Sequence, residues 1–351
     1  MTGLDIHCAE KTSSTRQKQI KEWETVMEKV AYAEKLIKKV IASIEKHGGK
    51  DCLSSIILTG SFGRGEPTYT VGGDGELQLK SDVEIALVFP DSAQKQTVEN
   101  LIEAVSSEFT EDLNLMAINE KRVRKAYNFN FSLRVPRYKT IFTYDLFNGS
   151  RTIWGRDFVK ENTVTASDVD PYEAKRLVAN RIGELVYLQN SADESSKDYL
   201  RKQWKGKLIL AIVSAWLICE GVYVSSYHGQ YQKLYSKEKE AEKTIGKGFL
   251  REYEKVFRFL REDGSEYETP DELLVGYVKK MDRYFKQKSI RKPKVNSVSR
   301  LMKYTIRYIK TGMKYGLIGF EDNILQALIS DYWNRTDKVT ADADVWHKVL
   351  Y

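Results

Sequence analysis

The chain has 351 residues, of which 42% are hydrophobic and 30% are charged. This balance is typical of folded globular proteins, excludes an extensively disordered chain, and leaves room for two domains of ordinary size. The net charge of +7 is compatible with a nucleotide or nucleic-acid partner but does not require one.

The cysteines, Cys8, Cys52 and Cys219, lie far apart and form no CxxC pair, so we expect neither a disulfide framework nor a zinc site. Met1 to Arg16 lacks the apolar core of a signal peptide. Leu208 to Cys219, the most apolar stretch, is much shorter than the roughly 20 residues of a membrane span. We therefore expect a soluble cytoplasmic protein, with a buried helix at this stretch and no membrane partner.

The chain begins with residues 1–13, which show no periodicity and predict a loose tail. From Ser14 to His47, apolar residues recur mostly at three- and four-residue steps, which predicts a helix that ends at Gly48-Gly49. Ile56 to Leu58 then reads as a short buried strand. It leads directly into a glycine-rich turn, Gly60 to Gly65, whose composition suits a backbone that an anion approaches closely.

The next predicted strand contains an acidic pair, Asp82 and Glu84, within the sequence Ser-Asp-Val-Glu-Ile followed by Ala-Leu-Val-Phe. Residues two apart share a face of a strand, so both carboxylates point the same way while Val83 and Ile85 point into a core. Adjacent carboxylates repel each other unless a positive charge lies between them, and a divalent metal ion is the usual solution.

Together, the turn and the acidic pair resemble the signature of the DNA-polymerase-β-like nucleotidyltransferase superfamily, in which a strand, a Gly-Ser turn and an acidic-x-acidic strand follow in order. The matching residues are Gly60, Ser61, Arg64, Gly65, Asp82 and Glu84. The gap between the two halves is longer here than is usual in that family, and we expect the extra residues, Thr68 to Gln78, to form an inserted surface loop.

The rest of the first half alternates further helix and strand signals. Residues 92–108 predict a helix, and 113–118 and 139–147 predict strands, the last closed by Asn148-Gly149. Residues 119–138 are rich in basic and aromatic side chains, a combination that fits either the core of a strand pair or contact with single-stranded nucleic acid. These elements predict a small mixed sheet backed by helices.

A loop rich in Thr, Asp and Ser at 162–170 predicts the domain boundary. Beyond it nearly every segment has helical periodicity: about 172–190, 198–222, 227–245, 247–262, 270–286, 297–315 and 320–335. The predicted class is therefore α+β, with a nucleotidyltransferase palm over residues 14–165 and an all-helical domain over 170–351.

The resemblance implies two-metal chemistry with Mg²⁺, for which Mn²⁺ is an alternative. Asp82 and Glu84 would bridge two ions, and a third carboxylate on a neighbouring strand would complete the site and accept the acceptor's proton. Asp145 is our candidate for that third ligand, although it also fits a residue that initiates a turn. Asp112 and Glu120 are weaker candidates.

The resemblance also implies that the Ser61 hydroxyl and the backbone around Gly60 bind the β- and γ-phosphates of a nucleotide. For Arg64, contact with phosphate and a structural bridge to Glu66 both remain open, and we favour the bridge slightly.

In the helical half, Lys207, Ser226 and Tyr227 resemble the lysine, serine and tyrosine that grip a nucleotide in poly(A)-polymerase-like and cyclic-dinucleotide-synthase-like members. Tyr227 would be a platform for base stacking. The open alternatives are that Lys207 merely lies at a buried helix end, that Lys205 replaces it, and that Ser225 caps the following helix. Arg181 falls on an inward helix stripe, where a charge needs a partner: a carboxylate of the first domain or the substrate.

These observations predict an enzyme that transfers a nucleoside monophosphate from a nucleoside triphosphate to a hydroxyl acceptor and releases pyrophosphate. The acceptor is a small molecule or a nucleotide in the favoured version. The alternatives are an inactive nucleotide-binding or regulatory protein of the same fold, and an RNA-binding or RNA 3′-end-modifying protein, with nucleic acid as a partner that the sequence does not favour.

Overall fold

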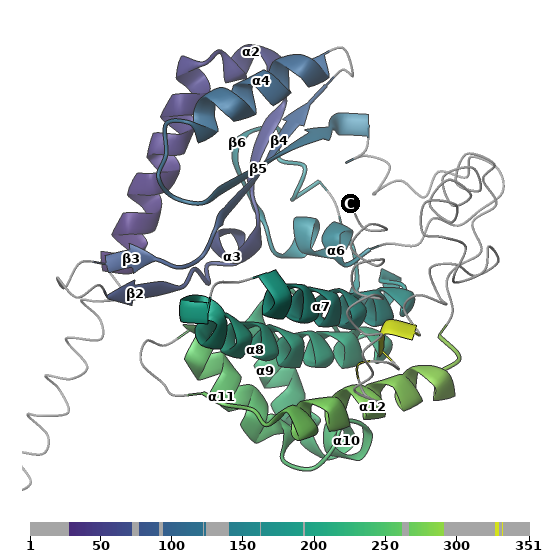
Figure 1. Ribbon diagram of the computed structural model, residues 1–351. Coiled ribbons are helices and arrows are strands. Elements are labelled where there is room, and N and C mark those ends of the chain that lie inside the picture. Colours follow the sequence, from purple (N-terminus) through teal and green to yellow (C-terminus); the bar gives the residue numbers. More distant parts are fainter. Residues whose placement is uncertain are drawn as a thin grey trace, which may run out of the picture. The chain divides into compact units, whose positions relative to one another are not determined.

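The computed structural model describes residues 28–71, 77–90, 94–121, 123, 140–161, 163–191, 194–261, 267–290, 327–329 and 332. The chain divides into two compact units (Figure 1). The described residues up to Glu120, together with Ile153–Arg156, make up the first unit, and the other described residues make up the second.

A four-stranded mixed sheet forms the centre of the first unit, in the order β5 (Leu113–Asn119), β4 (Val83–Phe89), β1 (Ser55–Leu58) and β6 (Arg151–Gly155). β1 is antiparallel to β4, and β4 is parallel to β5. Residues 28–46 are helical, as are α2 (Gly49–Cys52) and α4 (Lys95–Ser106). The predicted strands at 56–58 and 113–118 are confirmed, and the helix predicted over 92–108 is confirmed for Lys95–Ser106.

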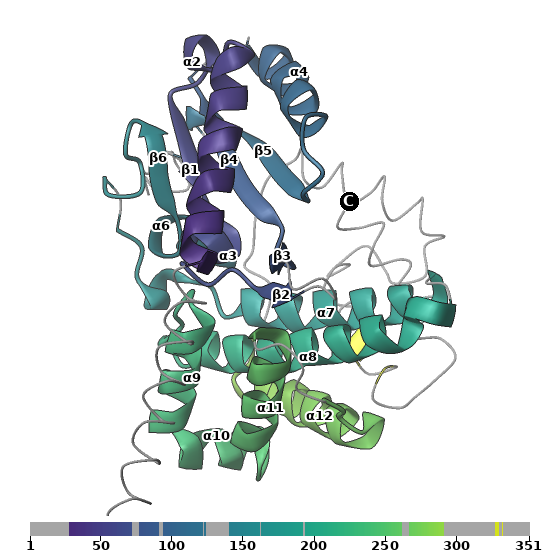
Figure 2. The ribbon, with the colours of Figure 1, turned by 90° about the vertical axis from the view of Figure 1, so that its left-hand side faces the viewer.

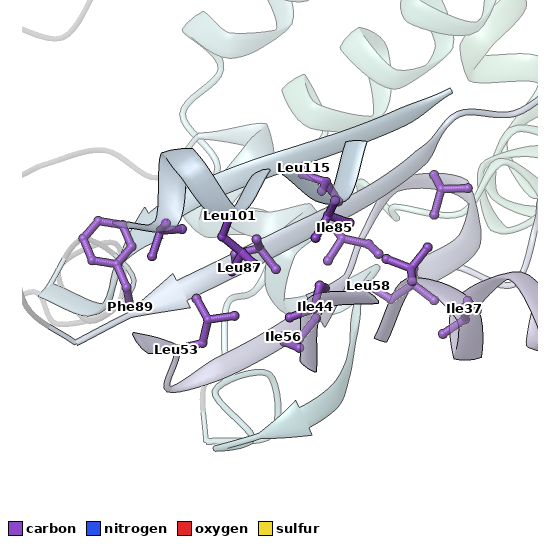
Figure 3. Packing of buried hydrophobic residues seen from close by; sticks show 14 of the residues in the cluster. Ile37, Ile44, Leu53, Ile56, Leu58, Ile85, Leu87, Phe89, Leu101 and Leu115 are labelled. Atoms are coloured by element: carbon purple, nitrogen blue, oxygen red, sulfur yellow. The ribbon is translucent and has the colours of Figure 1, made fainter. Parts of the chain in front are cut away.

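Apolar residues from one face of this sheet form a single core with the helix at 28–46 and with α4 (Figure 3). Val40 and Ile44 of the helix, Ile85 and Leu87 of β4, and Val98 of α4 are fully buried in it. Each such side chain contributes about 1.5–3 kcal/mol to stability through burial. Figure 2 shows the helix at 28–46 running along the strands. The strand before the glycine turn, β1, and the strand with the acidic pair, β4, therefore both pack in the same core.

The described residues of the stretch Thr68 to Gln78 include two paired strand segments, so the prediction of a surface loop there is wrong. β2 (Tyr69–Val71) pairs antiparallel with β3 (Leu77–Leu79). The Tyr69 ring is buried, packs edge-on against Tyr32 at a centroid distance of 6.0 Å, and its hydroxyl donates to the Lys29 carbonyl at 3.0 Å. Alternating apolar residues on both arms explain the pairing, which the glycines between them obscured in the sequence.

Helices dominate the second unit. They are α6 (Ile141–Asn148), the short 3₁₀ turn η2 (Ala166–Asp168), α7 (Tyr172–Ser191), α8 (Glu194–Cys219), α9 (Tyr227–Ser236), α10 (Glu238–Thr244), α11 (Phe249–Arg261) and α12 (Asp271–Gln287). The helix expected over 227–245 is thus two helices that meet at Lys237. The segments expected at 297–315 and 320–335 lie outside the described residues, except for 327–329 and 332, which are helical. The described residues thus combine a small mixed sheet with many helices, which is compatible with the predicted α+β class.

The strand predicted over 139–147 is the helix α6, and this is a second correction. Thr140 caps the helix, since its side chain accepts from the Thr143 backbone N–H at 3.1 Å. Thr143, Tyr144, Leu146 and Phe147 are buried, a spacing that one face of a helix also produces. An apolar run this short is compatible with both the strand period and the helix period, and the Thr140 cap favours the helix.

The division between the units also differs from the predicted boundary at residues 165–170. The described residues between 121 and 152 group with the second unit, although Ile153–Arg156 return to the sheet through β6. α6 is bound to later parts of the second unit: the Tyr144 hydroxyl donates to the Tyr223 carbonyl at 2.9 Å, and the Ile141 N–H donates to Glu173 of α7 at 3.3 Å. The Thr- and Ser-rich loop carries a capping box between Thr165 and Asp168 instead of a domain linker.

Leu208 to Cys219 form the apolar half of α8, and Leu208, Ile212 and Trp216 are almost completely buried, as expected for a core helix. Of the helices in the described part of the chain, none combines the length and the apolar character that a membrane crossing requires.

Candidate functional site

The glycine turn and the acidic strand meet at Gly60. This residue has φ +59°, a left-handed conformation that suits glycine, and it opens the four-residue helix α3 (Gly60–Gly63) directly after β1. A Cβ at residue 60 would fall 1.9 Å from Glu84 Oε2, so the backbone of the turn lies directly against the Glu84 carboxylate. Only a glycine permits this approach.

Backbone bonds fix Glu84 in this position. The Thr59 N–H donates to the Glu84 carbonyl at 2.9 Å, and the Thr59 hydroxyl lies 3.2 Å from the same oxygen. Val83 and Ile85 are fully buried, whereas Asp82 and Glu84 are half-buried. The predicted division of this strand into a core face and an acidic face is therefore confirmed, and the acidic face is the one that carries the turn.

Ser61 follows Gly60, and its Oγ is buried without a hydrogen-bond partner among the described residues. Leaving such a group unsatisfied costs about 1–3 kcal/mol, so buried hydroxyls are normally paired. An acceptor supplied by a ligand, such as a phosphate oxygen, would satisfy it.

Arg64 is held by Glu66. Its Nε lies 3.6 Å from Glu66 Oε2, and the exposed fractions of the two side chains are 13% and 12%. The Glu66 N–H also donates to the Ser61 carbonyl at 2.8 Å, which ties the end of the turn to its beginning. The arrangement supports the structural interpretation of Arg64.

The strand beside the acidic pair supplies no acid opposite Glu84. In the parallel β4–β5 register, Glu84 lies opposite Asn114, and the Val83 N–H donates to the Asp112 carbonyl at 2.9 Å. Glu120 lies six residues beyond Asn114, about 20 Å along an extended chain, and is paired with Arg156 at 3.5 Å. It is therefore too distant to serve as a third ligand. Across the described ranges, no three acidic, histidine or cysteine side chains gather closely enough to hold a metal ion.

Asp145 lies on α6 in the second unit, so the prediction that it sits on a strand of the sheet is wrong. Its carboxylate accepts from the Tyr223 hydroxyl, at 3.1 Å to Oδ1 and 3.3 Å to Oδ2. The Tyr144 and Tyr223 rings pack at a centroid distance of 5.1 Å. The Asp145 carboxylate thus holds the segment before α9 through Tyr223. The two residues are far apart in sequence, so no local sequence pattern predicts this contact.

The two candidate lysines of α8 differ in environment. Lys205 is buried; its Nζ donates to the Thr269 carbonyl at 3.1 Å and pairs with Asp271 at 2.6 Å, which is a structural role. Lys207 is half-buried, and its Nζ lies 4.0 Å from the centroid of the Trp204 ring. Lys207 is therefore the better candidate for contact with an anionic ligand.

Arg181 of α7 lies over the same Trp204 ring, with Cζ 5.6 Å from its centroid, and pairs with Glu184 on its own helix at 2.5 Å. Sequence reasoning did not identify Trp204, although its position three residues before Lys207 on a helix places the two side chains together.

Ser226 caps α9, because its Oγ accepts from the Gly229 N–H at 3.0 Å. The capping function assigned to Ser225 as an alternative thus belongs to its neighbour, and Ser225 is buried against Gly149. Tyr227 is half-buried, and its carbonyl accepts from the Tyr253 hydroxyl at 3.1 Å. Most of the basic and aromatic segment at 119–138 lies outside the described residues.

No protein-family model, curated protein sequence or solved structure matches this chain. Any functional assignment therefore rests on the residues and contacts given above.

Proposed function

We propose that the chain is a Mg²⁺-dependent nucleotidyltransferase that transfers a nucleoside monophosphate from a nucleoside triphosphate to a hydroxyl acceptor. One observation carries the proposal: the Glu84 carboxylate lies against the Gly60 backbone, beside the buried and unsatisfied Ser61 hydroxyl. A carboxylate, a close glycine backbone and an unused hydroxyl donor are what a metal–triphosphate complex requires from a protein.

The residues of the first unit have distinct roles in this proposal. Asp82 and Glu84 offer hard carboxylate oxygens of the kind that Mg²⁺ prefers. The Ser61 hydroxyl donates to a phosphate oxygen, and Gly60 lets the backbone approach. Arg64 keeps the turn in shape through Glu66. Bound Mg²⁺ would neutralise phosphate charge and acidify the acceptor hydroxyl.

For the second unit we retain Lys207 as the candidate for contact with a nucleotide, because it is half-buried over Trp204, whereas Lys205 is buried in structural contacts. Ser226 has a sufficient structural role as a helix cap, so the proposal does not need it as a ligand. We favour a small molecule or a second nucleotide as the acceptor.

A second candidate is a nucleotide-binding regulatory protein without transferase activity. The observation that favours it is the place of Asn114 opposite Glu84, where a third carboxylate on the neighbouring strand would complete a metal site. The position of Asp145 on a helix also removes the sheet ligand that the sequence suggested.

The two candidates separate in one assay. The full chain is incubated with Mg²⁺, each nucleoside triphosphate singly and in pairs, and a panel of hydroxyl acceptors, and pyrophosphate release is followed. We expect release by the native protein and by a Glu103→Ala control, which removes an exposed acid of α4, and loss of release by Asp82→Ala. Nucleotide binding with no pyrophosphate from any combination would favour the regulatory protein.

A further inference from the structure

The outward side of α11 carries a row of cations. Arg251, Lys255 and Arg258 follow one another at steps of four and three residues, which places them on one side of the helix over about 10 Å. Lys247 lies in the turn just before the helix. The side chains of all four are exposed. We call these residues the α11 basic row.

Most of this charge has no counter-ion. In the described part of the chain, Lys247, Arg251 and Arg258 form no ion pair, and only Lys255 has one, with Glu252 at 2.7 Å. Lys286 of α12, by contrast, pairs with Asp282 on its own helix at 2.6 Å. A row of like charges raises the local potential and favours an anionic partner.

Aromatic rings adjoin the basic row. α9 packs beside α11 (Figure 2), and Tyr231 of α9 stacks with Tyr253 and Phe257 of α11 at centroid distances of 6.2 Å. Tyr235 continues this group at 6.4 Å from Tyr231. At 63%, Tyr235 is the most exposed large hydrophobic side chain of the described residues.

Glu254, an acid of α11, is already engaged. The Tyr231 hydroxyl donates to Glu254 at 2.8 Å, and this hydrogen bond raises the pKa of Tyr231. Tyr231 therefore stays neutral, and Glu254 is turned toward it. What remains open to solvent is the row of cations on α11 and, beyond Tyr231, the ring of Tyr235.

We propose that this surface of α9 and α11 binds single-stranded nucleic acid, with the α11 basic row on the phosphates and Tyr235 stacked on a base. Phosphate contacts supply affinity without sequence preference, and stacking on aromatic rings selects strands whose bases are free. A duplex keeps its bases paired and offers Tyr235 no such face. The surface needs neither nucleoside triphosphate nor Mg²⁺, so it is independent of the function proposed above.

The test is fluorescence anisotropy of labelled oligouridine and oligothymidine of about 20 nucleotides, longer than a typical single-strand site, with the full chain at several salt concentrations and without nucleotide or Mg²⁺. We expect Arg251→Gln with Arg258→Gln to weaken binding at least about tenfold and to lower the salt slope by about two. Tyr235→Ala should weaken binding about tenfold, and Tyr235→Phe should retain it.

A matched control is Lys279→Gln with Arg283→Gln on α12, which removes the same charge from exposed residues one helical turn apart and should leave affinity nearly unchanged. Asp82→Asn should bind like the native chain, so failure of the catalytic proposal does not affect this one. The proposal is overturned by absence of binding at low salt, by equal losses in the α12 control, by an unchanged Tyr235→Ala, or by equal affinity for a duplex or for polyglutamate.

Discussion

Glu84 Oε2 lies where the Cβ of any other residue at position 60 would stand, only 1.9 Å from the ideal atom. Gly60 and Glu84 are thus coupled: a side chain at 60 must displace the carboxylate that we propose as a ligand. Gly65 has a similar backbone, with φ +71°, but a Cβ there meets nothing within 4 Å. Substitutions at Gly60 and Gly65 therefore separate the effect of the Glu84 contact from the effect of left-handed backbone strain.

We expect Gly65→Ala to cost about 1–2 kcal/mol from left-handed strain alone. Gly60→Ala should cost more and should also abolish pyrophosphate release, because it moves Glu84. Urea unfolding of both variants gives the comparison. Equal losses of stability, with activity retained in Gly60→Ala, would show that the Glu84 contact is unimportant.

Glu108 predicts a pH dependence in the first unit. Lys46 Nζ at 2.5 Å, Ser43 Oγ at 2.6 Å and His47 Nε2 at 2.9 Å converge on its carboxylate, and these hydrogen bonds lower its pKa from 4.5 to about 2. A depressed folded-state pKa contributes stability that is complete above 4.5 and is lost as the pH falls toward 2.

Glu108→Gln should therefore lower the melting temperature at pH 7, and its difference from the native chain should shrink steadily below pH 4.5. Thermal unfolding between pH 7 and pH 3 measures this. A difference that stays constant across the range would mean that the charge of Glu108 contributes nothing.

The Tyr223–Asp145 hydrogen bond should be measurable by a double-mutant cycle. A bond between a neutral donor and a carboxylate contributes about 1.5–3 kcal/mol, so Tyr223→Phe and Asp145→Asn should show a coupling of that order in unfolding free energy. Additive effects would indicate that the two side chains do not interact in solution.

Substitutions of the two lysines of α8, Lys205 and Lys207, should have different effects on stability and on nucleotide binding. Lys205→Met leaves Thr269 and Asp271 without their buried partner and should destabilise the chain by about 3 kcal/mol. Lys207→Met should change stability little but weaken nucleoside triphosphate binding about tenfold. Calorimetric unfolding and nucleotide titration of both variants decide between this assignment and the reverse, in which Lys205 is the ligand.

Local patterns predicted the elements around the turn well. Ile56 to Leu58 are a continuous apolar run that is buried throughout, and burial alternates with a period of two around Asp82 and Glu84, as the residue types indicate. The glycine-rich turn was equally readable, because Gly60 needs a left-handed backbone and a close neighbour.

Tertiary contacts decided the rest. Residues 141–147 fit a strand and a helix equally, and the Thr140 cap and the partner Tyr223 selected the helix. Because the predicted strand is a helix, the prediction that Asp145 lies on a strand of the sheet was wrong as well. Likewise, the roles of Lys205 and Ser226 depend on Thr269 and on the Gly229 N–H, which pattern reading does not locate.

The most direct test of the proposed site is a calorimetric titration of the full chain with a non-hydrolysable nucleoside triphosphate, in Mg²⁺ and in a chelator. We expect Mg²⁺ to tighten binding at least about tenfold, worth about 1.4 kcal/mol, in the native chain, and to have no effect in Asp82→Asn or Glu84→Gln. An equal gain from Mg²⁺ in native and variant chains, or no nucleotide binding in either condition, would contradict a metal–triphosphate site at these carboxylates.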